Sequence, residues 1–336
     1  MNNVAEREVL IPPALAAFVP QPLAGTVHAL AGQSMGTTWS VRFCGPARCD
    51  LAAVQAALQA ELDLVVTQMS HWQPDSLLCQ YNRSESGSWR ALPAPFWQVL
   101  TAGLAVANLS NGAFDPTLGA LVDLWGFGPP GPRLVPPTAD EIAMARASCG
   151  WQRLRLDAAT RSVLQPGGLA LDFSGIAKGY AVDRLAVCLA RLGYPSHLVD
   201  IGGELRGCGI KPDGQPWWVA LETPEGTALP QTIAALHGLS VATSGDYRRG
   251  FVHDGLRYAH TLTLHTGKPL AQAPAAVSVL HPQCMLADAW ATALTVLPSR
   301  DALALADRQQ LAAQIIVRDA GRTVCHRSAA LSAMLP

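Results

Sequence analysis

The sequence predicts an α+β fold, in which strands and helices are mixed without the strict alternation of a doubly wound parallel sheet. Two observations support this prediction. Strand-like and helix-like hydrophobic patterns follow one another irregularly, and polar motifs extend from Met35 to Thr292 without an intervening linker. We therefore expect an irregular, Pro- and Ala-rich lead-in over residues 1–27 and one folded unit over residues 28–334.

The first half of the chain is expected to hold a strand, two helices and a loop. Thr37–Phe43 alternates like a strand, and Leu51–Met69 has apolar residues at helical spacing without a breaker. Residues 95–110 form a second predicted helix, which ends at Asn111-Gly112. Five prolines within Pro129–Pro137 predict a loop.

The second half is expected to be richer in strands. A short strand over 169–173 leads into a helix over about 174–192, and a last strong helix runs from about 282 to 297. Between these helices, strands are expected at 197–201, 217–221, 239–243, 258–264 and 276–280.

Composition excludes several classes of protein. A net charge of −1 provides no basic surface of the kind that binds nucleic acid. No apolar run reaches the ~20 residues of a membrane helix. The eight cysteines form no Cys-x-x-Cys pair, so we expect reduced thiols rather than a zinc site or a disulfide framework.

The N-terminal residues do not resemble a secretory signal. Val9–Pro20 is interrupted by Pro12 and Pro13, and the preceding Glu6-Arg7-Glu8 is not basic. We expect a cytoplasmic protein, or a periplasmic one if the sequence starts downstream of a leader.

One pair of polar residues is placed to bind a metal. Asp288 and Thr292 are four residues apart on a predicted helix and so share a face, among small alanines. A carboxylate, a hydroxyl and a nearby carbonyl are hard oxygen ligands that suit Mg²⁺. The alternative is that Asp288 caps the helix and Thr292 lies in the core.

A second motif runs from a predicted strand into a helix. The turn between Asp172 and Lys178 leaves backbone N–H groups at the positive end of a helix, where a diphosphate can bind. Lys178 would add a formal charge, although the Gly-Lys-Ser/Thr ending of a Walker loop is missing. A capping Asp172 with Lys178 on the surface explains the same spacing equally well.

Two further segments carry candidate residues. Asp115, in the turn Gly112–Thr117, could bind the polar edge of a heterocycle, although a plain loop explains the same residues. His260 is a candidate general base because its ordinary pKa lies near neutrality, although a single His is more often structural. Ile201–Glu204 predicts a tight turn.

In this order, the motifs resemble the FAD:protein FMN transferase (ApbE) family over roughly residues 30–300. The resemblance rests on seven blocks of the sequence: Ser34–Trp39, Met69–Trp72 with Ser76 and Asn82, Gly112–Thr117, Asp172–Asp183, Asp200–Glu204, Thr243–Tyr247, and Ala287–Ala289 with Thr292. It implies a single T-fold-like catalytic unit.

The resemblance implies roles for individual residues. It places His260, Asp288 and Lys178 in catalysis, with His260 as the base that deprotonates the acceptor hydroxyl. The implied FAD contacts are Met35, Trp72, Ala113, Phe114, Asp115, Asp172, Lys178 and Leu262. The implied Mg²⁺ ligands are Gly175 and Ala291, through backbone oxygens, and Asp288 and Thr292.

These roles imply a Mg²⁺-dependent transferase that links the FMN half of FAD to a Ser or Thr hydroxyl of a target protein carrying an FMN-binding domain, and releases AMP. The chain departs from the family pattern after His260, where Thr263, Leu264 and His265 replace a segment that normally contains an Asp. Trp72 replaces a Tyr, and Leu77 a Glu.

Two alternative functions use the same motifs. An FAD pyrophosphatase would pass FMN to water, and sequence separates it poorly from a transferase because both need the metal site. A flavin-binding protein with little catalysis is compatible with the altered residues after His260. The metal pair Asp288 and Thr292 counts against it, because binding alone does not require a metal.

Overall fold

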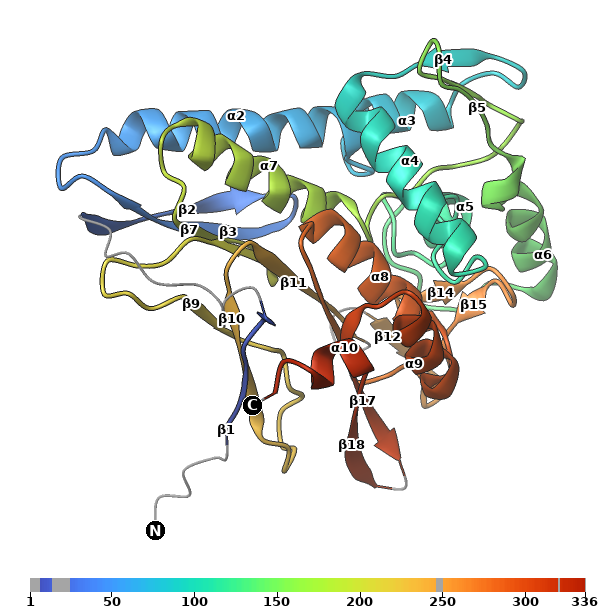
Figure 1. Ribbon diagram of the computed structural model, residues 1–336. Coiled ribbons are helices and arrows are strands. Elements are labelled where there is room, and N and C mark those ends of the chain that lie inside the picture. Colours follow the sequence, from blue (N-terminus) through green and yellow to red (C-terminus); the bar gives the residue numbers. More distant parts are fainter. Residues whose placement is uncertain (1–6, 14–24, 246–249, 320, 336) are drawn as a thin grey trace.

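An eight-stranded sheet crosses the centre of the computed structural model, which describes residues 7–13, 25–245, 250–319 and 321–335 (Figure 1). The strand order is β18-β17-β16-β11-β8-β7-β3-β2, and every neighbouring pair is antiparallel. The strands are β2 (Thr26–Ser34), β3 (Thr37–Gly45), β7 (His197–Ile201), β8 (Glu204–Cys208), β11 (Leu239–Ser244), β16 (Ala276–His281), β17 (Ala312–Asp319) and β18 (Arg322–Arg327).

Three long helices cover one face of this sheet: α2 (Leu51–Met69), α7 (Ala177–Arg191) and α8 (Cys284–Val296) (Figure 1). Helix α2 begins at Asp50, whose carboxylate accepts a hydrogen bond from the Ala53 N–H at 3.0 Å. Its buried residues recur every three or four positions, which is the spacing of a single helical face. They are Val54, Leu58, Leu62, Val65 and Met69.

The opposite face packs against a smaller sheet of order β1-β10-β9. Its strands are β1 (Arg7–Leu10), β9 (Trp217–Ala220) and β10 (Gln231–Leu236). Side chains of β16 alternate between the two cores: Val277 and Val279 lie in the helix-side core, and Leu280 lies in the core beneath the small sheet. The large sheet is therefore buried on both faces.

The N-terminal lead-in is not irregular throughout. Residues 7–10 form β1, which pairs parallel with β10. Glu8 forms an ion pair with Arg327, and the Ile11 N–H donates to the Met334 carbonyl at 2.8 Å. These contacts attach the first described residues to the last ones.

The remaining elements flank the sheet. Most of residues 77–164 form a group beside the ends of α2 and α8 (Figure 1). Its elements are α3 (Leu77–Asn82), β4 (Trp89–Ala91), α4 (Ala94–Leu109), α5 (Gly119–Leu124), α6 (Ala139–Ser148), η1 (Trp151–Arg153), β5 (Arg155–Asp157) and β6 (Ser162–Leu164). The others are β12 (Gly250–His253), β13 (Leu256–Ala259), β14 (Leu262–Thr263), β15 (Lys268–Pro269), α9 (Ser299–Arg308) and α10 (Ala329–Ser332).

Helices α7 and α8 approach each other unusually closely. A Cβ on Gly179 would lie 2.3 Å from the Cys284 carbonyl oxygen and 2.9 Å from Asp288 Cβ, so only glycine fits. Asp183 of α7 then accepts hydrogen bonds from the Cys284 and Met285 N–H groups at 3.0 and 2.9 Å. The side chain of Asp183 thus accepts the free N–H groups at the start of α8. The residue before the helix, Gln283, does not cap them with its own side chain.

The α+β prediction is confirmed, and so are the helices at α2, α4, α7 and α8. The strand predicted over 169–173 is wrong: only Ala170 makes an isolated bridge, to Leu118. The strand predicted over 258–264 is interrupted between β13 and β14, at His260 and Thr261. Helix α9 and strands β17 and β18 follow the helix that was expected to be the last strong one.

All eight cysteines are free thiols, as expected. In the part of the chain that the structure describes, no helix is both long enough and apolar enough to cross a membrane.

We expect Gly179→Ala to lower the free energy of unfolding by about 1–3 kcal/mol, because the added methyl overpacks the α7–α8 contact. Urea unfolding monitored by circular dichroism measures this change. Val187→Ala is the matched control: Val187 lies on the same helix and is half exposed, so its effect should stay within about 0.5 kcal/mol. Equal stability of wild type and Gly179→Ala would contradict the close packing.

Candidate active site

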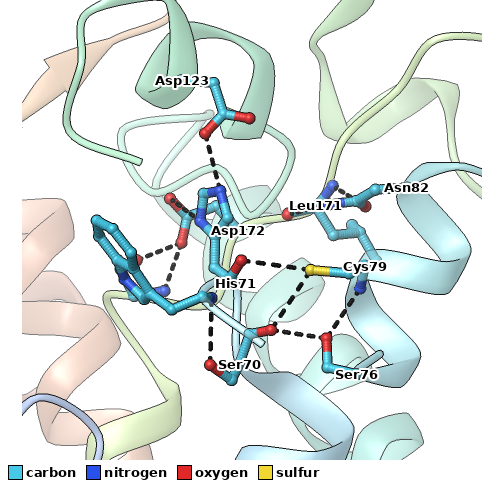
Figure 2. A network of polar contacts seen from close by, with 10 residues as sticks. Ser70, His71, Ser76, Cys79, Asn82, Asp123, Leu171 and Asp172 are labelled. Carbon is cyan, nitrogen blue, oxygen red and sulfur yellow. Dashed lines mark hydrogen bonds and ion pairs between the residues drawn. The ribbon is translucent and has the colours of Figure 1, made fainter. Parts of the chain in front are cut away.

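The candidate site is built around the turn that precedes α7. Although Leu169–Phe173 reads as a strand, its backbone is hydrogen-bonded by side chains and by loop backbone rather than by a neighbouring strand. Asn82 donates to the Leu171 carbonyl at 2.9 Å and accepts from the Leu171 N–H at 2.7 Å (Figure 2). The Asp172 N–H donates to the Pro116 carbonyl at 2.9 Å. These bonds fix the carboxylate of Asp172 at the entrance to α7.

Helix α8 meets this turn at Gly175. A Cβ on Gly175 would lie 2.8 Å from Thr292 Oγ1 and 3.3 Å from the ring of Phe114. Glycine thus allows the backbone before α7 to touch both the hydroxyl of α8 and the Gly112–Thr117 segment. The structure brings together Gly175, Thr292 and Phe114, which the sequence placed in three separate motifs.

Asp288 lies one turn before Thr292 on α8 and is only 6% exposed. Its Oδ2 accepts a hydrogen bond from the Gly179 N–H at 3.0 Å, which ties the carboxylate to the first turn of α7. The Ala291 carbonyl accepts a hydrogen bond from the Thr295 hydroxyl at 2.8 Å. The buried carboxylate of Asp288 and the hydroxyl of Thr292 thus lie on the side of α8 that faces α7 and the turn before it.

This donor set fits Mg²⁺, which binds oxygen ligands and keeps positions for water and phosphate. It does not fit zinc, which prefers nitrogen and sulfur ligands. Among the described residues, no three His, Cys, Asp or Glu side chains gather as a metal site. That result does not bear on a site with one carboxylate supplemented by hydroxyl and carbonyl oxygens.

Lys178 lies in the first turn of α7. The residue that precedes this helix, Ile176, makes no side-chain cap. Its Nζ forms an ion pair at 2.6 Å with Oε1 of Glu204, whose side chain is 2% exposed. Glu204 follows the tight turn that was predicted at Ile201–Glu204, in which Gly202 and Gly203 have positive φ. The buried carboxylate of Glu204 thus holds the ammonium group of Lys178 beside the β7–β8 turn.

Met35 occupies the tip of the β2–β3 hairpin with a φ of 53°, an unusual value for a residue other than glycine. This hairpin contacts the β7–β8 turn, because the Gly202 N–H donates to the Thr38 carbonyl at 3.1 Å. Glu204 begins β8 directly after that turn. Continuous contacts therefore connect the Met35 hairpin to Lys178.

The carboxylate of Asp115 accepts hydrogen bonds from neighbouring residues on both of its oxygens. Its Oδ1 accepts from the Thr117 N–H and hydroxyl at 2.9 and 2.6 Å, and its Oδ2 accepts from the Trp151 N–H at 3.2 Å. Burial raises the pKa of the carboxyl, and these hydrogen bonds oppose the rise. The adjacent Ala113 and Phe114 are buried, and Phe114 reaches Gly175.

His260 lies between β13 and β14, with its ring edge-on to Phe127 at 6.5 Å between ring centroids. Leu262, two residues later, is buried in a cluster with Leu121 and Trp125. The block Thr243–Tyr247 is described only in part, because Asp246 and Tyr247 lie outside the described residues.

Sequence reasoning missed one polar cluster, at His71 (Figure 2). His71 Nε2 hydrogen-bonds Asp123 Oδ1 at 2.9 Å, and its Nδ1 lies 3.6 Å from Asp172 Oδ2 as an ion pair. Burial by itself would lower the pKa of His71, but the two carboxylates raise it to about 10. His71 stands beside the expected FAD contact Trp72, but no sequence signal connects residue 71 to Asp123.

The ring of Trp72 is 56% exposed and lies 6.4 Å from the His71 ring, measured between centroids. Burial by itself would raise the pKa of Asp172, but the ion pair with His71, together with hydrogen bonds from Ser174, holds it below its usual value. The cluster therefore places an exposed aromatic face next to a buried, ionised carboxylate.

The cluster should make stability pH-dependent. Folded His71 stays protonated up to about pH 10, whereas the unfolded chain binds this proton only below about pH 6.5. Its contribution to the free energy of unfolding is therefore complete below pH 6.5 and declines as the pH rises towards 10. Urea unfolding of wild type and His71→Gln at pH 6.5, 8 and 9.5 should show a shrinking difference. A difference that stays constant would mean that folded His71 is neutral.

Comparisons with known proteins agree on one family. A sequence model described as "ApbE family" matches residues 35–316. A "FAD:protein FMN transferase" of Vibrio cholerae serotype O1 is 37% identical over 294 residues, 87% of each chain. A protein of the same name from Klebsiella pneumoniae is 34% identical over 308 residues, 90% of this chain and 88% of the other.

The fold agrees with solved structures. The apo crystal structure of the Pseudomonas stutzeri flavinyl transferase ApbE superimposes with a TM-score of 0.85 and 38% identity. The alignment covers 92% of this chain and 97% of that one.

Proposed function

The chain belongs to the ApbE family, and on this premise we propose that it is a Mg²⁺-dependent FAD:protein FMN transferase. It would cleave FAD, link FMN through a phosphoester to a Ser or Thr hydroxyl of a target protein with an FMN-binding domain, and release AMP. The observation that carries the proposal is the contact between the turn before α7 and the oxygen-bearing side of α8, at Gly175 and Thr292.

This contact would bring a diphosphate-binding position next to oxygens that can bind a metal. In the first turn of α7 the Ala177 N–H already donates to the Phe173 carbonyl and the Gly179 N–H to Asp288, so a phosphate there would be attracted by the positive end of the helix and by the ammonium group of Lys178. Asp288, Thr292 and the carbonyls of Gly175 and Ala291 would hold Mg²⁺ beside that position. The ion, when bound, supplies a positive charge that stabilises developing negative charge on phosphoryl oxygens.

The residues of the chain would then perform three tasks. Trp72 and Asp172 would hold FAD, the first by its exposed ring face and the second by accepting a hydrogen bond. Met35, Leu262 and Ala113–Asp115 would complete the FAD-binding surface. Lys178 would place its ammonium group near the diphosphate while Glu204 limits its movement.

The transfer itself follows from this placement. The acceptor hydroxyl oxygen would form a bond to the FMN-side phosphorus as the bond from that phosphorus to the AMP oxygen breaks. His260 would take the hydroxyl proton, and AMP would leave with its negative charge balanced by Lys178 and the metal. Position and electrostatics supply most of the acceleration in reactions of this kind.

The first test mixes the chain with FAD, Mg²⁺ and an FMN-binding-domain protein encoded by the same genome. We expect the acceptor to become a fluorescent band on a denaturing gel, with AMP released in equal amount. EDTA or Asp288→Ala should abolish labelling, whereas Asp301→Asn, an exposed carboxylate on α9, should not change it. Release of AMP with free FMN and no label would indicate a pyrophosphatase instead.

The second test concerns the proposed base. We expect His260→Ala to slow FMN transfer by about 10²–10⁴-fold, the usual contribution of general base catalysis, while FAD affinity changes little. Single-turnover labelling rates and FAD titration measure the two effects separately. Transfer at the wild-type rate would remove His260 from the mechanism.

A further inference from the structure

The cluster formed by His71, Asp123 and Asp172 has a geometry that structural packing alone does not require. Its three side chains come from separate places in the chain: the segment after α2, helix α5 and the turn before α7 (Figure 2). Both ring nitrogens of His71 face carboxylates, although the side chain is only 9% exposed. A buried cation paired in this way costs desolvation energy, so the arrangement calls for a functional reason.

We propose that His71 is a positioning residue for FAD: it holds the Asp172 carboxylate ionised and oriented to accept a hydrogen bond from an N–H or O–H of the substrate. This inference rests on the proposed function. Asp123 would act through His71, as the anchor that fixes the ring. Neither His71 nor Asp123 needs to touch FAD.

The two oxygens of Asp172 have different surroundings. Oδ1 accepts hydrogen bonds from both the N–H and the hydroxyl of Ser174, the first at 2.6 Å. Oδ2 faces His71 Nδ1 at 3.6 Å, which is an ion-pair distance and too long for a hydrogen bond. The imidazolium thus fixes the charge and direction of the carboxylate and leaves Oδ2 able to accept a hydrogen bond from a ligand.

On the other side of the His71 ring, the position of Nε2 is fixed by Asp123. Its hydrogen bond to Asp123 is covered by the backbone of Gly128, on which a Cβ would lie 1.9 Å from Asp123 Oδ1 and 3.2 Å from His71 Nε2. The loop after α5 therefore packs directly against this bond and leaves no room for a side chain at position 128. The preceding residue, Phe127, contacts His260, so the same loop serves two parts of the proposed site.

The backbone around His71 and Trp72 is held by Ser70 and Cys79. The Ser70 hydroxyl accepts from the Trp72 N–H at 3.2 Å, and the Cys79 thiol donates to the His71 carbonyl at 3.3 Å (Figure 2). The exposed ring of Trp72 and the carboxylate of Asp172 both lie near the His71 ring, at 6.4 Å between ring centroids and at 3.6 Å from Nδ1 to Oδ2, respectively. A planar heterocycle with an N–H on its edge matches that pair.

The experiment measures FAD affinity without an acceptor, by titration of flavin fluorescence, for wild type, His71→Gln and Gly128→Ala. Glutamine removes the positive charge, and the alanine methyl displaces Asp123 from the ring. We expect each variant to weaken FAD binding by about tenfold or more, because a charge-supported contact loses its orientation. In steady-state labelling, KM for FAD should rise while kcat at saturating FAD stays within about threefold.

The matched control is His197→Gln. His197 is buried, and its Nδ1 lies 2.8 Å from the Tyr194 carbonyl near the opposite end of α7. Urea unfolding should show that this control loses stability but keeps wild-type FAD affinity. If His71→Gln does not fold, Gly128→Ala provides the same test with the His71 ring intact.

Each outcome has a defined meaning. Wild-type FAD affinity in both His71→Gln and Gly128→Ala would overturn the inference, and so would an equal loss of affinity in His197→Gln. Failure of the wild-type protein to bind FAD would instead overturn the proposed function, and the inference with it. A loss in the two site variants alone, confined to KM, would support the positioning role.

Discussion

The close contact of α7 with α8 is the constraint on which the rest of the molecule depends. Without a side chain at Gly179, the first turn of α7 lies directly against the Cys284 carbonyl. Asp288 then bonds the Gly179 N–H, and Asp183 bonds the first N–H groups of α8. The same close approach brings Thr292 to Gly175. The packing of α7 against α8 therefore also assembles the candidate site.

Buried charges around this contact are balanced locally. Lys178 pairs with Glu204, Arg206 with Asp183, and His71 with two carboxylates. An isolated charge at such depth is costly, but a paired one can hold a fixed orientation. These positive groups are therefore held beside α7 or the turn before it, in a protein whose net charge is only −1.

Local patterns were sufficient to predict much of the fold. Helices α2 and α8 stand out by their periodicity and lack of breakers, and β16 by its run of β-branched and apolar residues. Leu169–Phe173 was misassigned because its partners are the side chain of Asn82 and the Pro116 carbonyl, which a local pattern cannot reveal. The sequence motifs also placed the turn before α7 and α8 in one site, but the pairing of His71 with Asp123 spans 52 positions and exists only in the folded chain.

The contacts between the two ends of the chain affect how the protein is made. Strand β1 needs β10 as its partner, and Glu8 needs Arg327, more than 300 residues later. At about 5–20 residues per second, the ribosome takes roughly 15–65 s to produce the residues that complete this contact. Strand β1 stays unpaired until β10 has been synthesised, and the ion pair of Glu8 with Arg327 can form only after nearly the whole chain has been made.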